Sequence, residues 1–242
     1  MKIRYHALDT LRGFTLLNMI VYHLLWDLVY LYDLPWSWFY SQGAYIWQQS
    51  ICWTFILLSG FCWQLGSKSG RRGLTVFLAG ILVTVVTVLF VPEEQICFGI
   101  LTLLGSCMLL LTVLHPYCQK IPAEIGMILS ALLFVLMRNV NRGYLGFEGW
   151  NLYKLPENLY QNLFSAYLGF PSAEFFSTDY FSLLPWYFLF LAGYYLFSCL
   201  RNRSKLQYLQ SGIQWLSFFG KHSLLIYLLH QPIIYVVLEL FL

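Results

Sequence analysis

The sequence predicts an all-α protein, a bundle of about seven transmembrane helices that forms a single domain over residues 1–242. Only 10% of the residues are charged, whereas soluble domains carry about 25%. Hydrophobic residues make up 59% of the chain, and its mean hydropathy is +0.64. Several stretches of about 20 residues contain almost no charge, which is the length that a helix needs to cross a membrane. We therefore expect an integral membrane protein.

Charges and helix-breaking residues mark the ends of the predicted spans. The first span follows a polar segment. Its apolar run is too long for a signal peptide and lacks a small-residue cleavage site, so we expect this span to be retained. The second span ends at the basic segment 66–72, the third at Pro92, the fourth before Pro116 and the sixth at the basic segment 201–205. An amphipathic stretch, residues 211–219, precedes the last span and is expected at the membrane interface. The predicted spans are residues 11–32, 45–65, 74–91, 96–114, 124–140, 181–200 and 220–242.

Basic residues fall almost entirely on one side of this topology. With the N-terminus in the cytoplasm, 11 of the 14 Lys and Arg residues are cytoplasmic. Cytoplasmic loops carry such an excess, so the distribution predicts a cytoplasmic N-terminus and an extracytoplasmic C-terminus. The long connection, residues 141–180, is then extracytoplasmic. It is rich in aromatic residues, and we expect it to form a packed lid of short helices.

Three ionisable residues share one face of the first predicted span. His23 follows Arg12 by 11 residues, about 20° past three helical turns, and Asp27 comes about one turn later. At 1.5 Å per residue, His23 lies about 16 Å deeper than Arg12, near the middle of a roughly 30 Å hydrocarbon layer. Ionisable residues at that depth are costly and usually face a cavity or the interior of a bundle. This face is therefore the candidate catalytic site.

His23 and Asp27 are the predicted catalytic residues. Imidazole titrates near neutral pH, which makes His23 the candidate general base. Asp27 is placed to orient the ring or to stabilise its cationic form. The alternative interpretation is that the two side chains only hydrogen-bond neighbouring helices together.

Arg12 belongs to a group of basic residues at the predicted cytoplasmic ends of the spans. An arginine at the inner end of a first span is ordinary for topology. Together with Arg71, Arg72 and Lys221, however, it suggests a surface that binds a polyanionic cofactor from the cytoplasm.

The last span carries the triplet His230-Gln231-Pro232. Pro232 frees a backbone carbonyl one turn earlier, and the two polar side chains are placed to satisfy such groups. We favour this structural interpretation slightly over catalysis. A metal site shared by His23 and His230 lacks an evident third ligand, so no metal is expected.

Motifs from the first span to the last resemble the transmembrane acyltransferase superfamily. Arg12 and His23 match the Arg-x10-His spacing of acyltransferase-3 proteins. The chain is most similar to bacterial heparan-alpha-glucosaminide N-acetyltransferase-like proteins. That similarity rests on the segments His23-Leu-Leu-Trp-Asp27, Phe98-Gly-Ile-Leu101 and Asp179-Tyr-Phe-Ser-Leu-Leu-Pro-Trp186.

The resemblance implies a membrane enzyme that takes an acyl group, commonly acetyl, from cytoplasmic acyl-CoA. The acceptor is usually a sugar amine or hydroxyl reached from the other side. The resemblance to bacterial proteins therefore implies a place in a bacterial plasma membrane and a role in glycan modification at the cell envelope. The lysosomal members carry their catalytic histidine in a loop after the first span, where this chain has Leu34-Pro35-Trp36. The role would then fall on His23, and specificity for glucosamine does not carry over.

The sequence thus predicts an acyl-CoA-dependent acetyltransferase whose partners are a glycan acceptor and membrane lipids, with no nucleic acid. His23 and Asp27 would carry the chemistry, and CoA phosphates would bind the basic residues Arg12, Arg71, Arg72 and Lys221. A proton-coupled carrier or flippase that uses His23 and Asp27 as a relay is the alternative. A structural membrane subunit is a weaker third hypothesis, and a homodimer is left open.

Overall fold

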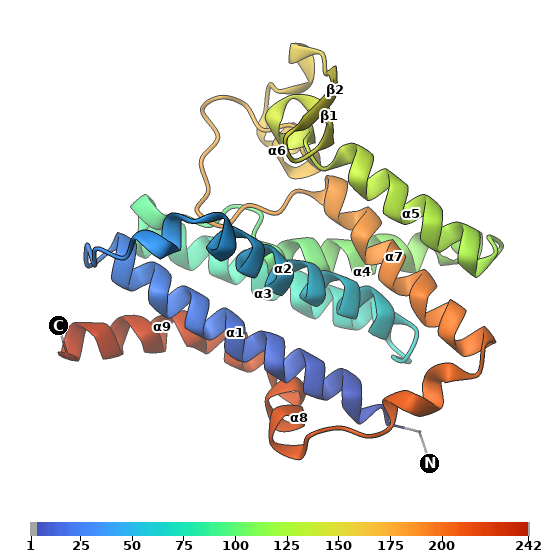
Figure 1. Ribbon diagram of the computed structural model, residues 1–242. Helices are drawn as coiled ribbons and strands as arrows, with labels where there is room; N and C mark the ends of the chain where they lie inside the picture. Colours follow the sequence, from blue (N-terminus) through green and yellow to red (C-terminus); the bar gives the residue numbers. More distant parts are fainter. Residues whose placement is uncertain (1–3, 242) are drawn as a thin grey trace. The chain divides into compact units, whose positions relative to one another are not determined.

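The computed structural model describes residues 4–241, which form a mainly α-helical chain (Figure 1). It divides into two compact units. The first unit takes in the chain up to Leu58 and the chain from Leu200 onward, and the second is Ser59–Cys199. The long helices are α1 (His6–Tyr30), α2 (Gln42–Trp63), α3 (Ser69–Phe90), α4 (Ile100–Cys118), α5 (Ala123–Met137), α7 (Leu183–Asn202) and α9 (Ser223–Phe241).

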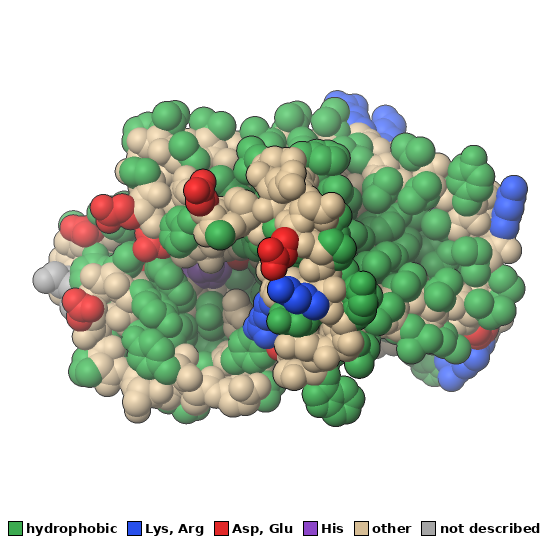
Figure 2. All heavy atoms as spheres, turned by 90° about the horizontal axis from the view of Figure 1, so that it is seen from above, with side chains coloured by type: hydrophobic (Ala, Val, Ile, Leu, Met, Phe, Trp, Pro, Cys, Tyr) green, Lys and Arg blue, Asp and Glu red, His purple; other side chains and the backbone are tan. Residues whose placement is uncertain are grey.

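Six helices of the described chain are long and apolar enough to cross a membrane: α1, α3, α4, α5, α7 and α9. This confirms the polytopic helical fold. The second predicted span is also a long helix, α2, but it is not among the six because polar side chains such as Gln48 and Gln49 lower its hydropathy. Figure 2 shows many hydrophobic side chains across the visible face, with charged ones in a few separate patches. A surface of this kind suits a lipid environment.

In the first unit, α1 packs along the short amphipathic helix α8 (Gln214–Lys221) and also contacts α9. Glycines allow the close approach of α1 and α8. A Cβ atom on Gly13 would lie 2.0 Å from the carbonyl oxygen of Leu216, and one on Gly220 would lie 1.9 Å from that of Asp9. Two short 3-10 helices complete this unit, Ser37–Tyr40 after α1 and Lys205–Leu209 before α8.

In the second unit, small residues let α3 and α4 approach each other in the same way. A Cβ atom on Gly80 would lie 2.5 Å from the backbone nitrogen of Thr102, and one on Gly105 would lie 2.4 Å from that of Phe77. Such contacts are typical of helix packing in membranes, because backbones approach closely where side chains are small. A 3-10 turn, Pro92–Glu94, links α3 to the segment before α4.

The connection between α5 and α7 contains a β-hairpin that the sequence analysis missed. After the 3-10 turn Val140–Arg142, strands β1 (Tyr144–Phe147) and β2 (Trp150–Lys154) pair in antiparallel fashion, and the 3-10 turn Glu157–Leu159 and helix α6 (Leu163–Leu168) follow. The prediction of short helices is therefore correct for only part of this segment. The hairpin depends on non-local bonds, since the amide of Asn139 donates to the carbonyl oxygens of Glu148 and Trp150 at 2.8 and 3.1 Å.

Candidate active site

A buried polar centre joins α1 to α9 in the first unit. Asp27 on α1 is fully buried, and its carboxylate oxygens both accept a hydrogen bond from the side-chain nitrogen of Gln231 on α9, each at 2.9 Å. These residues are more than 200 positions apart in the chain. A buried carboxylate needs such donors because it loses the solvation of water.

His23 lies one turn before Asp27 and contacts α9 as well. Its ring centroid is 4.9 Å from that of His230, with the two rings inclined by 63°. His23 is half-buried, whereas His230 is buried, with 8% of its surface exposed. The Nδ1 atom of His230 contacts the carbonyl oxygen of Tyr227 one turn earlier. The structure therefore brings two histidines, a carboxylate and an amide together between α1 and α9, two helices of largely apolar sequence.

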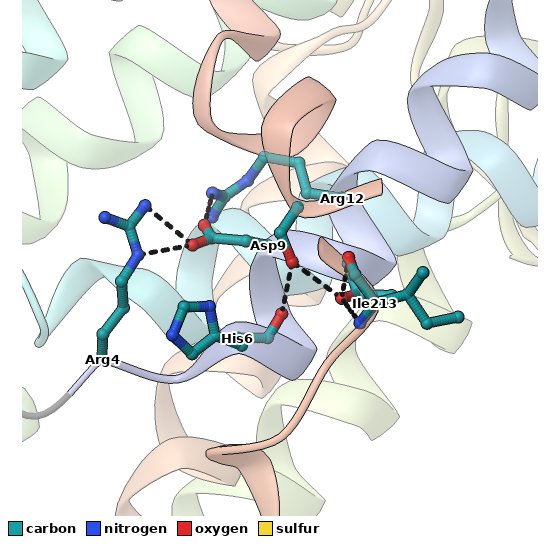
Figure 3. A network of polar contacts seen from close by, with 7 residues as sticks. Arg4, His6, Asp9, Arg12 and Ile213 are labelled. Atoms are coloured by element: carbon teal, nitrogen blue, oxygen red, sulfur yellow. Dashed lines mark hydrogen bonds and ion pairs between the residues drawn. The ribbon is translucent and has the colours of Figure 1, made fainter. Parts of the chain in front are cut away.

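Arg12 lies in a separate network at the N-terminal end of α1 (Figure 3). Its guanidinium contacts Asp9 at 3.3 Å, and Arg4 contacts the other oxygen of the same carboxylate at 2.9 Å. Thr10 in this turn binds Ser217 of α8 at 2.9 Å between their hydroxyl oxygens. Asp9 also lies in the first helical turn, where a negative charge is favourable. Arg12 therefore already has a carboxylate partner, about three turns away from His23 along the helix.

The other predicted cofactor-binding residues lie in different parts of the chain. Lys221 is exposed at the end of α8, beside Gly220, whose contact with Asp9 places it at the Arg12 end of α1. Arg71 and Arg72 are exposed in the first turn of α3, in the second unit. Arg72 donates to the carbonyl oxygen of Cys62 at 3.3 Å.

An open cavity of about 360 Å³ follows α1 in the first unit. Its wall contains Leu34, Pro35 and Trp36. Asp33 and Tyr40 line it as well. It thus combines a carboxylate with aromatic rings, and such rings have flat apolar faces and polar edges.

The family is decided by a sequence match over almost the whole chain. Residues 4–232 match the family described as heparan-alpha-glucosaminide N-acetyltransferase, catalytic. The chain belongs to this family. No curated protein and no solved structure matches it.

Membership of the heparan-alpha-glucosaminide N-acetyltransferase family makes the chain a transmembrane acetyltransferase in the general sense. It also agrees with the resemblance that the motifs predict. The matched region includes α1, both histidines of the polar centre and Gln231.

Two of the family-like segments meet in the second unit of this N-acetyltransferase family member. The backbone nitrogen of Phe181 donates to the carbonyl oxygen of Phe98 at 2.9 Å. Asp179 lies beside Gly99, the residue before α4, and accepts a hydrogen bond from the backbone of Ile100. Burial raises the pKa of Asp179 to about 6, although that hydrogen bond acts in the opposite direction.

The sequence analysis expects His230 and Gln231 to serve mainly as partners for backbone groups freed by Pro232. His230 does contact a backbone carbonyl oxygen, that of Tyr227, and its ring also lies against His23. Gln231 instead binds Asp27, a contact that the sequence analysis missed. The usable signal was the occurrence of two polar side chains within a strongly apolar span. Among residues 4–241, no cluster of three or more His, Cys, Asp or Glu side chains could hold a metal ion.

Proposed function

We propose that this protein transfers an acetyl group from cytoplasmic acetyl-CoA to an amine or hydroxyl of a glycan on the other side of the membrane. The observation that carries the proposal is the polar centre of His23, His230, Asp27 and Gln231, enclosed between two apolar helices of a chain that belongs to an acetyltransferase family. Buried ionisable residues in such helices are costly, so they are retained where they serve chemistry.

In the direct route, His23 acts as general base. It removes a proton from the acceptor while the acceptor nitrogen or oxygen bonds to the acetyl carbon. The carbon–sulfur bond breaks, and the CoA thiolate takes the proton back from the imidazolium. In the covalent route, a ring nitrogen of His23 bonds to the acetyl carbon, the carbon–sulfur bond breaks, and CoA leaves as the thiolate. The acceptor nitrogen or oxygen then bonds to the acetyl carbon, the bond to His23 breaks, and the acceptor proton passes by way of the imidazole to the thiolate. In both routes the negative charge of Asp27, fixed by Gln231, stabilises the cationic ring of His23.

Acetyl-CoA would bind through its phosphates to Arg12 and Lys221 in the first unit, with the pantetheine arm extending along α1 toward His23. Arg71 and Arg72, in the second unit, are further candidate ligands of phosphate. Guanidinium groups suit this role because they bind phosphate in a bidentate manner. Arg12 would exchange or share its contact with Asp9 on binding. On the acceptor side, aromatic residues of the segment 33–40 in the first unit would pack against sugar rings.

The proposal predicts that His23→Ala abolishes acetyl transfer in folded protein. The purified protein is placed in nanodiscs, and free CoA is measured with acetyl-CoA and a panel of amino sugars. We expect acceptor-stimulated CoA release in the wild type and a loss of about 100-fold or more in His23→Ala, the usual worth of a general base. His222→Ala, at an exposed histidine just after α8, is the matched control and should keep full activity.

Acetyl label trapped on His23 without an acceptor would support the covalent route, and its absence during turnover would support the direct one. A folded wild type that neither binds nor turns over acetyl-CoA would contradict the acetyltransferase. Proton-coupled solute flux in liposomes would then support the carrier, in which the same centre relays protons.

A further inference from the structure

The open cavity after α1 lies at the end of that helix opposite α8 and the Arg12 network (Figure 1). Its volume of about 360 Å³ is in the lower part of the range for small-molecule sites, roughly 300–1,000 Å³. Two of the rings that line it are accessible to a ligand, because Trp36 is 39% and Tyr40 65% exposed. Asp33 and Ser37 supply polar groups to the same wall. The cavity therefore offers flat apolar rings beside hydrogen-bonding atoms.

Local structure does not account for the carboxylate of Asp33. The residue follows the end of α1 with a φ of +52°, a place that glycine usually takes. A negative charge is also unfavourable near the C-terminal end of a helix. Within residues 4–241, no hydrogen bond or ion pair engages the exposed side chain of Asp33. A residue that departs from two local rules in this way indicates a functional position.

The surroundings of the cavity carry negative charge and lack cations. Residues 13–67 and 222–242, which include the second half of α1, the segment 33–40 and α9, contain no lysine or arginine. Arg12 lies about 27 Å along α1 from Tyr30, well beyond the screening length of about 8 Å at physiological salt. Glu239 of α9 adds a second carboxylate, which accepts a hydrogen bond from the hydroxyl of Tyr32 at 3.1 Å. A ligand here meets carboxylates without a compensating cation.

We propose that this cavity binds a sugar unit that carries no negative charge, beside the unit of the same glycan that receives the acetyl group. The rings of Trp36 and Tyr40 would pack against the apolar face of the sugar. The carboxylate of Asp33 and the hydroxyl of Ser37 would accept hydrogen bonds from its hydroxyl groups. Sulfated or carboxylated sugars would be repelled. The inference rests on the proposed function, because it assigns a further part of the acceptor of that reaction.

Aromatic residues also gather at membrane surfaces without binding a ligand. Such an anchoring role accounts for Trp36 and Tyr40. It does not account for the carboxylate of Asp33 in the same wall, because a charged group gains nothing from contact with apolar lipid. A sugar ring, with an apolar face and polar edges, suits both kinds of group.

The distance from the cavity to His23 bears on the length of the acceptor. Val29, which lines the cavity, follows His23 by six residues, about 9 Å along the helix axis. The cavity continues from Val29 to the segment 33–40. A sugar held there and a group reacting at His23 therefore belong to different units of one glycan, so oligosaccharides should be better acceptors than monosaccharides.

The test measures sugar binding to the protein in phosphatidylcholine nanodiscs by calorimetry, without acetyl-CoA. The probes are cellotriose, which is uncharged, and its C6-oxidised form, which has carboxylates in place of the hydroxymethyl groups. The variants are Trp36→Ala and Asp33→Asn, since asparagine tolerates a positive φ as aspartate does. Trp150→Ala, at a 79% exposed tryptophan of β2 in the second unit, is the matched control.

We expect cellotriose to bind the wild type and Trp150→Ala alike, and Trp36→Ala about tenfold more weakly, because a large aromatic contact is lost. The oxidised form should bind the wild type about fivefold more weakly than cellotriose does. Asp33→Asn should weaken cellotriose binding and strengthen that of the oxidised form, and this loss of selectivity should shrink as salt is added. If Trp36→Ala does not fold, Tyr40→Ala provides the same comparison.

Cellotriose binding that is unchanged in folded Trp36→Ala would overturn the inference, as would equal affinity of the wild type for the two probes. Failure of both cellotriose and N-acetylchitotriose to bind would overturn it as well. Acetyl-CoA turnover with glycan acceptors would in each of these cases leave the proposed function standing. Cellotriose binding that depends on Trp36, in a wild type that does not turn over acetyl-CoA, would support the sugar site and contradict the acetyltransferase.

Discussion

The side chain of Asp27 shows how a charged residue is accommodated inside this membrane protein. Its carboxylate is fully buried and receives two hydrogen bonds from Gln231. Pairing with a neutral amide stabilises the charge without neutralising it. The arrangement places the carboxyl group of Asp27 one helical turn from His23 on α1.

At the residue scale, Asp179 should make the stability of the folded protein depend on pH. Its pKa is raised from 3.8 to about 6, so the folded protein holds this proton more tightly than the unfolded chain does. Stability from this residue is therefore full below about pH 4 and falls as the pH rises through 6. The pKa difference corresponds to a loss of at most about 3 kcal/mol in the free energy of unfolding. We expect a smaller loss, because the side chain is only partly buried.

We expect the stability of Asp179→Asn to fall less than that of the wild type as the pH rises. The amide cannot ionise, but its oxygen still accepts the hydrogen bond from the backbone of Ile100. Melting temperatures of both proteins in detergent between pH 4 and 7.5 provide the measurement. Glu93→Gln, at an exposed carboxylate of the preceding turn, is the control and should follow the wild type. Parallel curves for wild type and Asp179→Asn would rule out the raised pKa.

At the scale of elements, the contact of α1 with α8 depends on the absence of side chains at Gly13 and Gly220. Either added Cβ atom would lie within about 2 Å of a backbone carbonyl oxygen on the other helix. Because these obstacles are backbone atoms, they cannot move aside as a flexible side chain would. The helices themselves would have to separate.

Gly220→Ala is therefore expected to destabilise the protein by about 1–3 kcal/mol, the usual cost of overpacking. Thermal unfolding in detergent, followed by intrinsic fluorescence, measures the effect. Gly149→Ala serves as the control, since a Cβ atom there meets nothing within 4 Å. Equal melting temperatures for the two variants would show that the α1–α8 contact is not as close as described.

At the scale of the whole molecule, the side of the membrane that each terminus faces depends on α2. If α2 crosses the membrane with the six strongly apolar helices, the number of spans is odd and the termini lie on opposite sides. The excess of basic residues on the predicted inner side favours that arrangement. Neither hydropathy nor helix length decides it for α2.

Reporter fusions after residue 242 test this topology in a bacterial host. We expect alkaline phosphatase to be active there and a fluorescent protein to be dark, because the C-terminus is predicted to be extracytoplasmic. Fusions in the basic segment 66–72 should give the opposite pattern. A fluorescent C-terminal fusion would place both termini in the cytoplasm and remove α2 from the set of spans.

The sequence by itself determined the helical membrane fold and which residues of α1 share one face in the candidate site. Hydrophobic runs bounded by charges define spans because the membrane imposes a length and a polarity on every segment. The turn from His23 to Asp27 is equally local, since helical geometry alone brings these two residues to one face. Arg12, Arg71, Arg72 and Lys221 remain predicted ligands of CoA.

Only the tertiary structure decided which residues complete the site. Gln231 meets Asp27, and His230 meets His23, across more than 200 residues of chain. The β-hairpin after Asn139 is held by side-chain bonds from Asn139 to Glu148 and Trp150, which hydropathy does not reveal. Such pairings depend on how the helices pack and on which buried polar groups need a hydrogen-bond partner. Local hydropathy and residue spacing do not predict either of these.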